Sequence, residues 1–453
     1  MNFSASTYQN EFLPADATEV HAVVTVTSGN GDSAPAGAAE KAVVLIVDTS
    51  GSMGQPGTKI RAARQALAAS VEELPDGVWF AVISGNHEAM CVYPPTFATG
   101  EPPSLVRADA RTRAEAGEVA RQLRPEGGTA IGTWLDLARD VFSGHPEAIK
   151  LAYLLTDGRN ESEPHENLEA ALRRCTGVFQ CDARGVGSDW EVSELRLVTS
   201  TLLGEVDIIA DPDEMDDDFR AFLERALGKA VADVRLRIWA PQGSTVKFLR
   251  QVAPAIDDLT AKAIPVNPLT GDFPTGAWAG DESRDYHLSV NVPVGKVGDE
   301  KLAARVSLVV DDQPVSQALV KAIWTDDEAL SARISPQVAH YTGQAELAVA
   351  IHEGLEARKQ GDNDTATVRL GRAVQLAHES GNEGTVKLLQ KVVEVDDAAT
   401  GTVRLKRGVA AVDEMALDTR STRTVRVTAK PQDPSTTPPT EPTPPAPASG
   451  PGA

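Results

Sequence analysis

The feature that most constrains the fold is an apolar run that ends in a loop of oxygen-bearing side chains. Residues 42–47 are all apolar, and the chain continues as Asp48-Thr49-Ser50-Gly51-Ser52. Such a run followed by turn residues is typical of a strand buried on both faces of a parallel sheet. Asp48, Ser50 and Ser52 place three oxygens on alternate residues of one turn, and Mg²⁺ prefers oxygen ligands. The sequence therefore predicts a cation-binding loop at the end of a buried strand.

The surrounding region, 41–229, alternates apolar strand patterns with amphipathic helical patterns. This alternation predicts an α/β fold, a Rossmann-like doubly wound and mainly parallel sheet with helices on both faces. Ligands of such sheets collect at the carboxyl ends of the strands. We expect strands at 42–48, 77–84, 150–156, 179–186 and 205–210, and helices at 58–73, 111–123, 131–142, 164–174, 190–202 and 214–229.

Two later segments carry matching side chains. Gly127-Gly128-Thr129 offers a further hydroxyl on a glycine-rich loop, and the apolar run 151–155 ends in Thr156-Asp157-Gly158. Asp157, like Asp48, then falls at the carboxyl end of an expected strand. The predicted site thus draws on three separate loops.

These motifs resemble the metal-ion-dependent adhesion site of von Willebrand factor type A domains, of the bacterial cytoplasmic kind. The D-x-S-x-S loop, the later threonine and the later T-D-G are all present, and the resemblance covers about residues 41–227. It implies Ser50, Ser52 and Thr129 as direct metal ligands, with Asp48 and Asp157 holding waters behind them. It also implies Mg²⁺ as the ion, with Mn²⁺ or Ca²⁺ as alternatives.

Other interpretations of the first loop are weaker. Asp48 and the serines are also good helix N-caps, but one capping loop would not explain the two distant loops. A nucleotide-binding P-loop lacks its Gly-Lys-Ser/Thr element. A haloacid-dehalogenase-like phosphatase needs a second aspartate where this chain has Ser50.

Composition narrows the class of protein. The 453 residues are enough for two or three domains, and the net charge is −22, which disfavours nucleic acid and anionic membrane as partners. Cys91, Cys175 and Cys181 form no disulfide framework and are expected to be buried thiols. We find no secretory signal and no apolar stretch near the ~20 residues of a membrane span, so a cytoplasmic protein is expected.

The remaining chain predicts further modules. A strand at 19–27, within residues 1–40, is expected to join a β-sandwich at 230–325, so that the sheet domain is inserted between them. Within that sandwich, Pro265 to Gly280 looks turn-rich. Residues 326–430 predict a helical region with two antiparallel helices around Gly361 and a strand-like end at 424–427. The Pro/Thr-rich tail, 431–453, is expected to be disordered.

Several other signals have structural interpretations. Trp134 and Trp190 are expected to be packing residues, and His87, His145 and His165 show no zinc-ligand spacing. The acidic run 211–218 is interpreted as a solvated capping turn before a helix.

The expected function is non-enzymatic. A partner protein's Asp or Glu would complete the shell of the bound ion, with residues 85–108 and 158–165 as the bordering loops. Two other roles remain open: an assembly subunit or co-chaperone of an AAA+ ATPase of the MoxR or chelatase-like type, and a signalling scaffold recruited through phosphorylated tail threonines such as Thr436. Magnesium-dependent phosphate-ester hydrolysis is the least favoured alternative.

Overall fold

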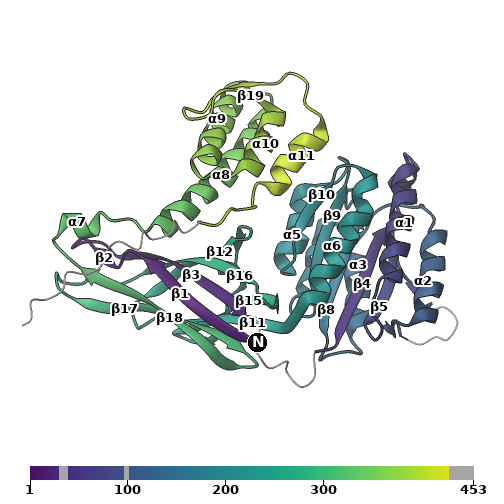
Figure 1. The fold of residues 1–453 in the computed structure, drawn as a ribbon, viewed down its shortest axis with the longest axis horizontal. Helices are drawn as coiled ribbons and strands as arrows, with labels where there is room; N and C mark the ends of the chain where they lie inside the picture. Colours follow the sequence, from purple (N-terminus) through teal and green to yellow (C-terminus); the bar gives the residue numbers. More distant parts are fainter. Residues whose placement is uncertain (30–38, 96–101, 428–453) are drawn as a thin grey trace, which may run out of the picture.

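A mainly parallel sheet forms the domain at the right of Figure 1. The computed structural model describes residues 1–29, 39–95 and 102–427, and within these residues the sheet has seven strands. The neighbours β10 to β5 pair in parallel, and β6 and β7 pair antiparallel to β5. The order along the sheet is β10 (Val206–Ile209), β9 (Gln180–Val186), β8 (Ile149–Thr156), β4 (Lys41–Asp48), β5 (Trp79–Gly85) and β6 (Ala89–Tyr93), with β7 (Val106–Arg107) beside β5.

Helices cover both faces of this sheet because its strands are apolar on both faces. Val43, Leu45 and Val47 of β4 pack in one core, whereas Ala42, Val44 and Ile46 pack in the other. The doubly wound α/β fold expected from the alternating pattern is thereby confirmed. The first core contains α1 (Thr58–Glu72), α2 (Ala110–Gln122) and α6 (Met215–Gly228); the second contains α3 (Ile131–Phe142), α4 (His165–Cys175) and α5 (Val192–Thr201).

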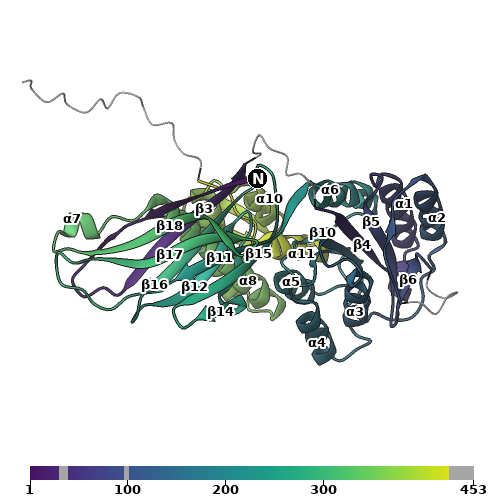
Figure 2. The same ribbon diagram turned by 90° about the horizontal axis from the view of Figure 1, so that it is seen from below.

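A β-sandwich lies beside the sheet domain (Figures 1 and 2). Apolar residues from both of its sheets share one core. The first sheet pairs β1 (Asn2–Gln9), β3 (Glu19–Gly29), β16 (Ser283–Asn291), β12 (Thr245–Ala253) and β13 (Asp257–Asp258). The second pairs β14 (Ile264–Asn267), β15 (Thr270–Ala279), β11 (Lys229–Trp239), β17 (Glu300–Val310), β18 (Gln313–Trp324) and β2 (Phe12–Leu13).

The sandwich is richer in strands than the sequence predicts. One strand is expected before residue 40, but β1 and β2 are present in addition to β3. The stretch from Pro265 to Gly280 is expected to be turn-rich, yet it forms most of β14 and all of β15. Both expectations were wrong. Strand β1 has few large apolar residues and no regular apolar–polar alternation, and Gly271, Pro274 and Gly276 within β15 resemble turn residues.

The C-terminal region is mostly helical, with one hairpin that sequence analysis missed. Helices α8 (Pro336–Lys359) and α9 (Asn363–Glu379) pack together around the expected corner at Gly361. The hairpin lies between the last two helices, and residues 424–427 are irregular rather than strand-like. The other elements are α7 (Glu328–Ser331), α10 (Glu383–Val392), β19 (Val393–Asp397), β20 (Thr402–Leu405) and α11 (Ala411–Arg420).

The chain returns to the other two domains through α11 and the segment after it. Arg420 Nε donates to Asp207 Oδ1 of β10 at 2.8 Å, and Arg423 donates to the other oxygen of Asp207. Thr424 Oγ1 donates to the Val252 carbonyl of the sandwich at 2.6 Å, and Val425 N donates to Gln344 of α8 at 3.0 Å. These few residues therefore join the sheet domain, the sandwich and the helical region.

Asp207→Asn is expected to loosen this junction. Burial opposes ionisation of Asp207, but Arg423 and Arg420 outweigh burial and lower its pKa below 3.8. We expect a loss of roughly 2 kcal/mol, seen as faster hydrogen exchange in 411–427, with exposed Asp213→Asn as the control. Because the pKa of Asp207 is lower in the folded protein than in the unfolded chain, ionised Asp207 stabilises the fold above pH 3.8. This contribution to the exchange protection of the wild type is lost as the pH falls below 3.8, and the Asp207→Asn variant lacks it throughout. Equal exchange in both variants would contradict this role.

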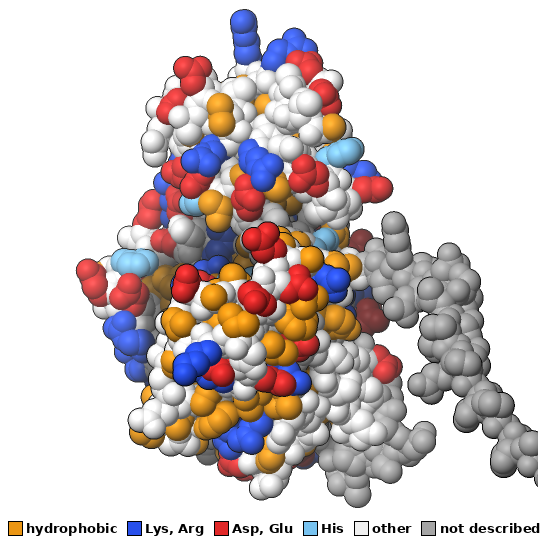
Figure 3. All heavy atoms as spheres, turned by 90° about the vertical axis from the view of Figure 1, so that its left-hand side faces the viewer, with side chains coloured by type: hydrophobic (Ala, Val, Ile, Leu, Met, Phe, Trp, Pro, Cys, Tyr) orange, Lys and Arg blue, Asp and Glu red, His pale blue; other side chains and the backbone are white. Residues whose placement is uncertain are grey.

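The outer end of the sandwich carries mixed side chains. Figure 3 shows hydrophobic side chains gathered in the lower part of this face, interrupted by charged groups of both signs.

None of the helices in the described ranges combines the length and apolar character needed to cross a bilayer. The Pro/Thr-rich tail and its threonines lie outside the described residues.

Candidate functional site

The loop after β4 is held rigidly around Asp48. Its Oδ1 accepts the backbone N–H of Ser50 at 2.7 Å, and its Oδ2 accepts the hydroxyl of Thr156 at the end of β8. The hydroxyls of Ser50 and Ser52 lie 2.9 Å apart. Because both carboxylate oxygens of Asp48 accept hydrogen bonds, the carboxylate is held in one orientation beside Ser50 and Ser52.

Asp157 lies beside the same hydroxyls. Ser52 Oγ donates to Asp157 Oδ1 at 2.6 Å, which brings the ends of β4 and β8 together. Asp48 and Asp157 are both fully buried, and Ser50 is nearly so. Parallel neighbouring strands thus place the predicted carboxylates at one edge of the sheet, as the sequence led us to expect.

Thr129 reaches the site on a loop that is bonded to both other loops. Gly51 N donates to the Gly127 carbonyl at 2.9 Å, and Ser162 N donates to the Thr129 carbonyl at 2.9 Å. Gly127 has a φ of +75°, a left-handed conformation that glycine adopts without strain. The backbone therefore fixes Thr129 between the first loop and the loop after β8.

Gly158 shows how closely the hydroxyls converge. A Cβ atom at this position would lie 2.8 Å from Thr129 Oγ1 and 3.4 Å from Ser52 Oγ. Both hydroxyls therefore face the same small space, which only a glycine leaves open. The rim of this space reaches the surface, since Gly51 and Gly127 are exposed.

The donor set fits a hard divalent cation. Ser50, Ser52 and Thr129 contribute three hydroxyl oxygens, with Asp48 and Asp157 supplying negative charge behind them. Burial raises the pKa of Asp48 to about 6, partly offset by hydrogen bonds from Ser50 and Thr156, and a bound cation would favour its charged form. The described residues contain no cluster of three or more His, Cys, Asp or Glu side chains that could hold a metal.

Lys59 is the site residue that sequence analysis missed. It lies in the first turn of α1 and donates from Nζ to Asp157 Oδ2 at 2.7 Å. Its side chain is only 9% exposed. Its position in the sequence could have indicated this role. A lysine in the first turn of a helix is disfavoured by the helix dipole, so its presence there suggests a nearby negative charge.

The other singled-out residues have structural settings. Trp134 and Trp190 are buried, which confirms them as packing residues. His87 and His165 are exposed. The acidic run differs from the prediction: Asp218 is not simply solvated, because it accepts Tyr153 Oη at 2.6 Å and Arg184 Nε at 2.9 Å.

The bordering segment 85–108 also differs from the expected loop. It contains strands β6 and β7, and residues 96–101 lie outside the described part of the chain. The cysteines are all buried and unbridged, as expected for buried thiols.

Comparison with known proteins agrees with this architecture. A von Willebrand factor type A domain model matches residues 43–160, and a von Willebrand factor type A C-terminal domain model matches residues 375–421. A solved structure named von Willebrand factor type A from Catenulispora acidiphila is 50% identical, with 94% of this chain and 97% of that chain covered and a TM-score of 0.87. This chain belongs to the von Willebrand factor type A family. Domains of this family generally mediate metal-dependent protein interactions.

Two more distant solved structures share the fold alone. The ArnB paralog VWA2 from Sulfolobus acidocaldarius is 13% identical, with 93% of this chain and 98% of that chain covered and a TM-score of 0.54. Human COPII-coat protein Sec24c is 10% identical, with 85% and 57% covered and a TM-score of 0.50. A comparison with curated proteins gave no match.

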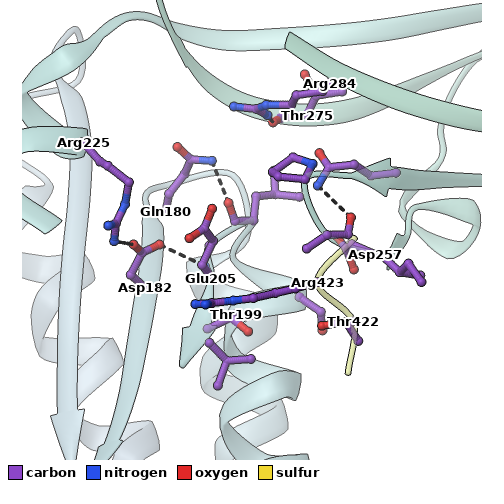
Figure 4. Close-up of a pocket in the computed structure, with 18 of the residues that line it drawn as sticks. Gln180, Asp182, Thr199, Glu205, Arg225, Asp257, Thr275, Arg284, Thr422 and Arg423 are labelled. Atoms are coloured by element: carbon purple, nitrogen blue, oxygen red, sulfur yellow. Dashed lines mark hydrogen bonds and ion pairs between the residues drawn. The ribbon is translucent and has the colours of Figure 1, made fainter. Parts of the chain in front are cut away.

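A separate cavity of about 410 Å³ lies between the type A domain, the sandwich and the C-terminal segment (Figure 4). Its lining shares no residue with the five-residue site. Charged side chains that line it already have partners within the protein: Arg225 pairs with Asp182, another lining residue, at 3.2 Å, and Arg284 donates to the Ala277 carbonyl at 2.8 Å. The cavity therefore belongs to the junction between domains.

Proposed function

We propose that this protein binds partner proteins through a divalent cation, with Mg²⁺ as the resident ion. Ser50, Ser52 and Thr129 would hold the ion directly, while Asp48 and Asp157 hold its waters. The convergence of Thr129 and Ser52 on the space beside Gly158 is the observation that carries this proposal. An Asp or Glu of the partner would complete the shell of the ion.

The chemistry of the site favours binding over catalysis. Three of its five side chains are neutral hydroxyls, so a bound cation keeps more of its positive charge than it would among carboxylates. Such an ion attracts a further carboxylate. Position 50, where a haloacid-dehalogenase-like phosphatase has its second aspartate, is a serine hydrogen-bonded to its neighbour Ser52. We therefore propose a non-enzymatic role.

Affinity capture from the source cell with the full chain tests this function. Retention of a partner in Mg²⁺ and its release by EDTA are expected, and Asp-to-Asn and Glu-to-Gln changes in the partner's contact surface should abolish retention. A dominant AAA+ ATPase among the EDTA-released proteins would identify the assembly-subunit role. Capture that is indifferent to EDTA, or turnover of phosphate esters that Asp48→Asn stops, would overturn the proposal.

Gly158→Ala is expected to weaken cation binding strongly. Its new Cβ would lie 2.8 Å from Thr129 Oγ1, so the hydroxyl has to move away from the ion. We expect at least tenfold weaker Mg²⁺ binding by calorimetry, with a stability loss of about 1–3 kcal/mol from overpacking. Gly144→Ala is the matched control, because a Cβ at Gly144 meets nothing within 4 Å. Equal affinities of the two variants would show that the Gly158 space does not hold the ion.

A further inference from the structure

Lys59 places a second cation at the proposed metal site. Its ammonium and the Ser52 hydroxyl bond to the two oxygens of one carboxylate, Asp157, at 2.7 and 2.6 Å. Lys59 Nζ also lies 3.6 Å from Asp189, whose side chain is 71% exposed. The ammonium is therefore fixed between a buried and an exposed carboxylate.

The Lys59–Asp157 ion pair stabilises the site when no metal is bound. Asp48 and Asp157 are both fully buried beside the serine loop, where Asp48 accepts Ser50 N at 2.7 Å and Asp157 accepts the Ser52 hydroxyl at 2.6 Å. A buried carboxylate without a partner is strongly destabilising. Lys59 supplies that partner, so the loops after β4 and β8 can hold their positions before any ion is bound.

The same ammonium opposes a divalent ion. A cation held by Ser52 would share the Asp157 carboxylate with Lys59, and like charges repel more strongly where water is excluded. Lys59 also lies in the first turn of α1, where the helix dipole adds positive potential. Each of these effects lowers the affinity for the metal.

We propose that Lys59 is a built-in counter-ion that keeps the site assembled without metal and sets its affinity for divalent cations low. This inference rests on the proposed function, because it concerns the same site. A weakly held ion is retained better when the partner's carboxylate adds negative charge, so Lys59 makes cation retention depend on the partner.

Lys59→Met tests the proposal, because methionine keeps most of the side-chain length without the charge. We expect Mg²⁺ and Mn²⁺ to bind at least about tenfold more tightly, which corresponds to about 1.4 kcal/mol, measured by calorimetry and by Mn²⁺ paramagnetic resonance. The melting temperature in EDTA is expected to fall and to recover in Mg²⁺. Arg61→Met is the matched control, since Arg61 is an exposed cation on the same helix.

The outcomes separate the two proposals. Unchanged or weaker ion binding by folded Lys59→Met, with Thr129-dependent binding in the wild type, would overturn only the role of Lys59. Ion binding that Thr129→Ala does not reduce would overturn the proposed site itself. If Lys59→Met unfolds in EDTA, its affinity is measured in Mg²⁺ by chelator competition. Failure to fold even in Mg²⁺ would count against the proposal, because the ion should replace the missing charge.

Discussion

Thr129→Ala is expected to reduce magnesium-dependent partner capture to the level seen in EDTA. Thr129 is nearly buried, and its hydroxyl faces the same space as Ser52. Alanine removes that oxygen while the backbone bonds of the loop, such as Ser162 N to the Thr129 carbonyl at 2.9 Å, remain available. The fold should therefore persist while the ion loses a direct ligand. Capture in Mg²⁺ and in EDTA, quantified for wild type and variant, measures the effect.

Thr133→Ala is the control for this experiment. Thr133 is exposed on α3, and its hydroxyl donates to the nearby Ala130 carbonyl at 2.8 Å. This variant should capture partners as the wild type does. Asp48→Ala is expected to match Thr129→Ala in capture, because Asp48 orients the serine loop through Ser50 N. Retained magnesium-dependent capture in both Thr129→Ala and Asp48→Ala would eliminate the adhesion mechanism.

The fold of the sheet domain was predictable because its local patterns and its packing agree. The apolar run 42–47 has no polar face, which requires helices on both sides, and both faces of β4 are indeed covered. The helix expected at 131–142 is α3 with the same bounds. Strong periodicity at the helical or strand repeat thus located the elements that carry the site.

The elements that were missed depend on contacts that no local pattern encodes. Strand β1 alternates exposed and half-buried residues with few large apolar side chains, and it forms by pairing with β3. Helix α11 lies in the region predicted to be helical, but its position depends on distant contacts: Ala416 and Leu417 pack in two different cores, and Arg420 and Arg423 pair with Asp207, more than 200 residues earlier in the chain. Long-range pairing of this kind outweighs local propensity.

The candidate site likewise contains five residues that the sequence predicted and one that it did not. Asp48, Ser50, Ser52, Thr129 and Asp157 were predicted from motif spacing, and the structure brings them together, although metal binding by them stays a prediction. Lys59 was missed because a lysine in a helix is ordinarily solvated. Its burial results from its pairing with Asp157, 98 residues away.

Trp134→Ala is expected to produce the largest loss of stability in the sheet domain. The ring is fully buried and lies on the backbone of β5, since a Cβ at Gly85 would be 2.4 Å from it. Its Nε1 donates to the Asn86 carbonyl at 2.7 Å, which also accepts Ala130 N, next to Thr129, at 3.0 Å. Removing the ring should cost about 3–5 kcal/mol in urea unfolding and weaken ion binding through the loosened Thr129 loop.

Two comparisons separate packing from other effects of losing a tryptophan. Trp134→Phe keeps most of the ring and loses the hydrogen bond, so a smaller cost of about 1–3 kcal/mol is expected. Trp79→Ala is the matched control, because Trp79 is half-buried, packs at a tilt against His145 and donates to the exposed Glu40 side chain at 3.1 Å. A Trp134→Ala variant no less stable than Trp79→Ala would show that the Thr129 loop is held without this ring. In that case the backbone bonds between the three loops alone would account for the rigidity of the site.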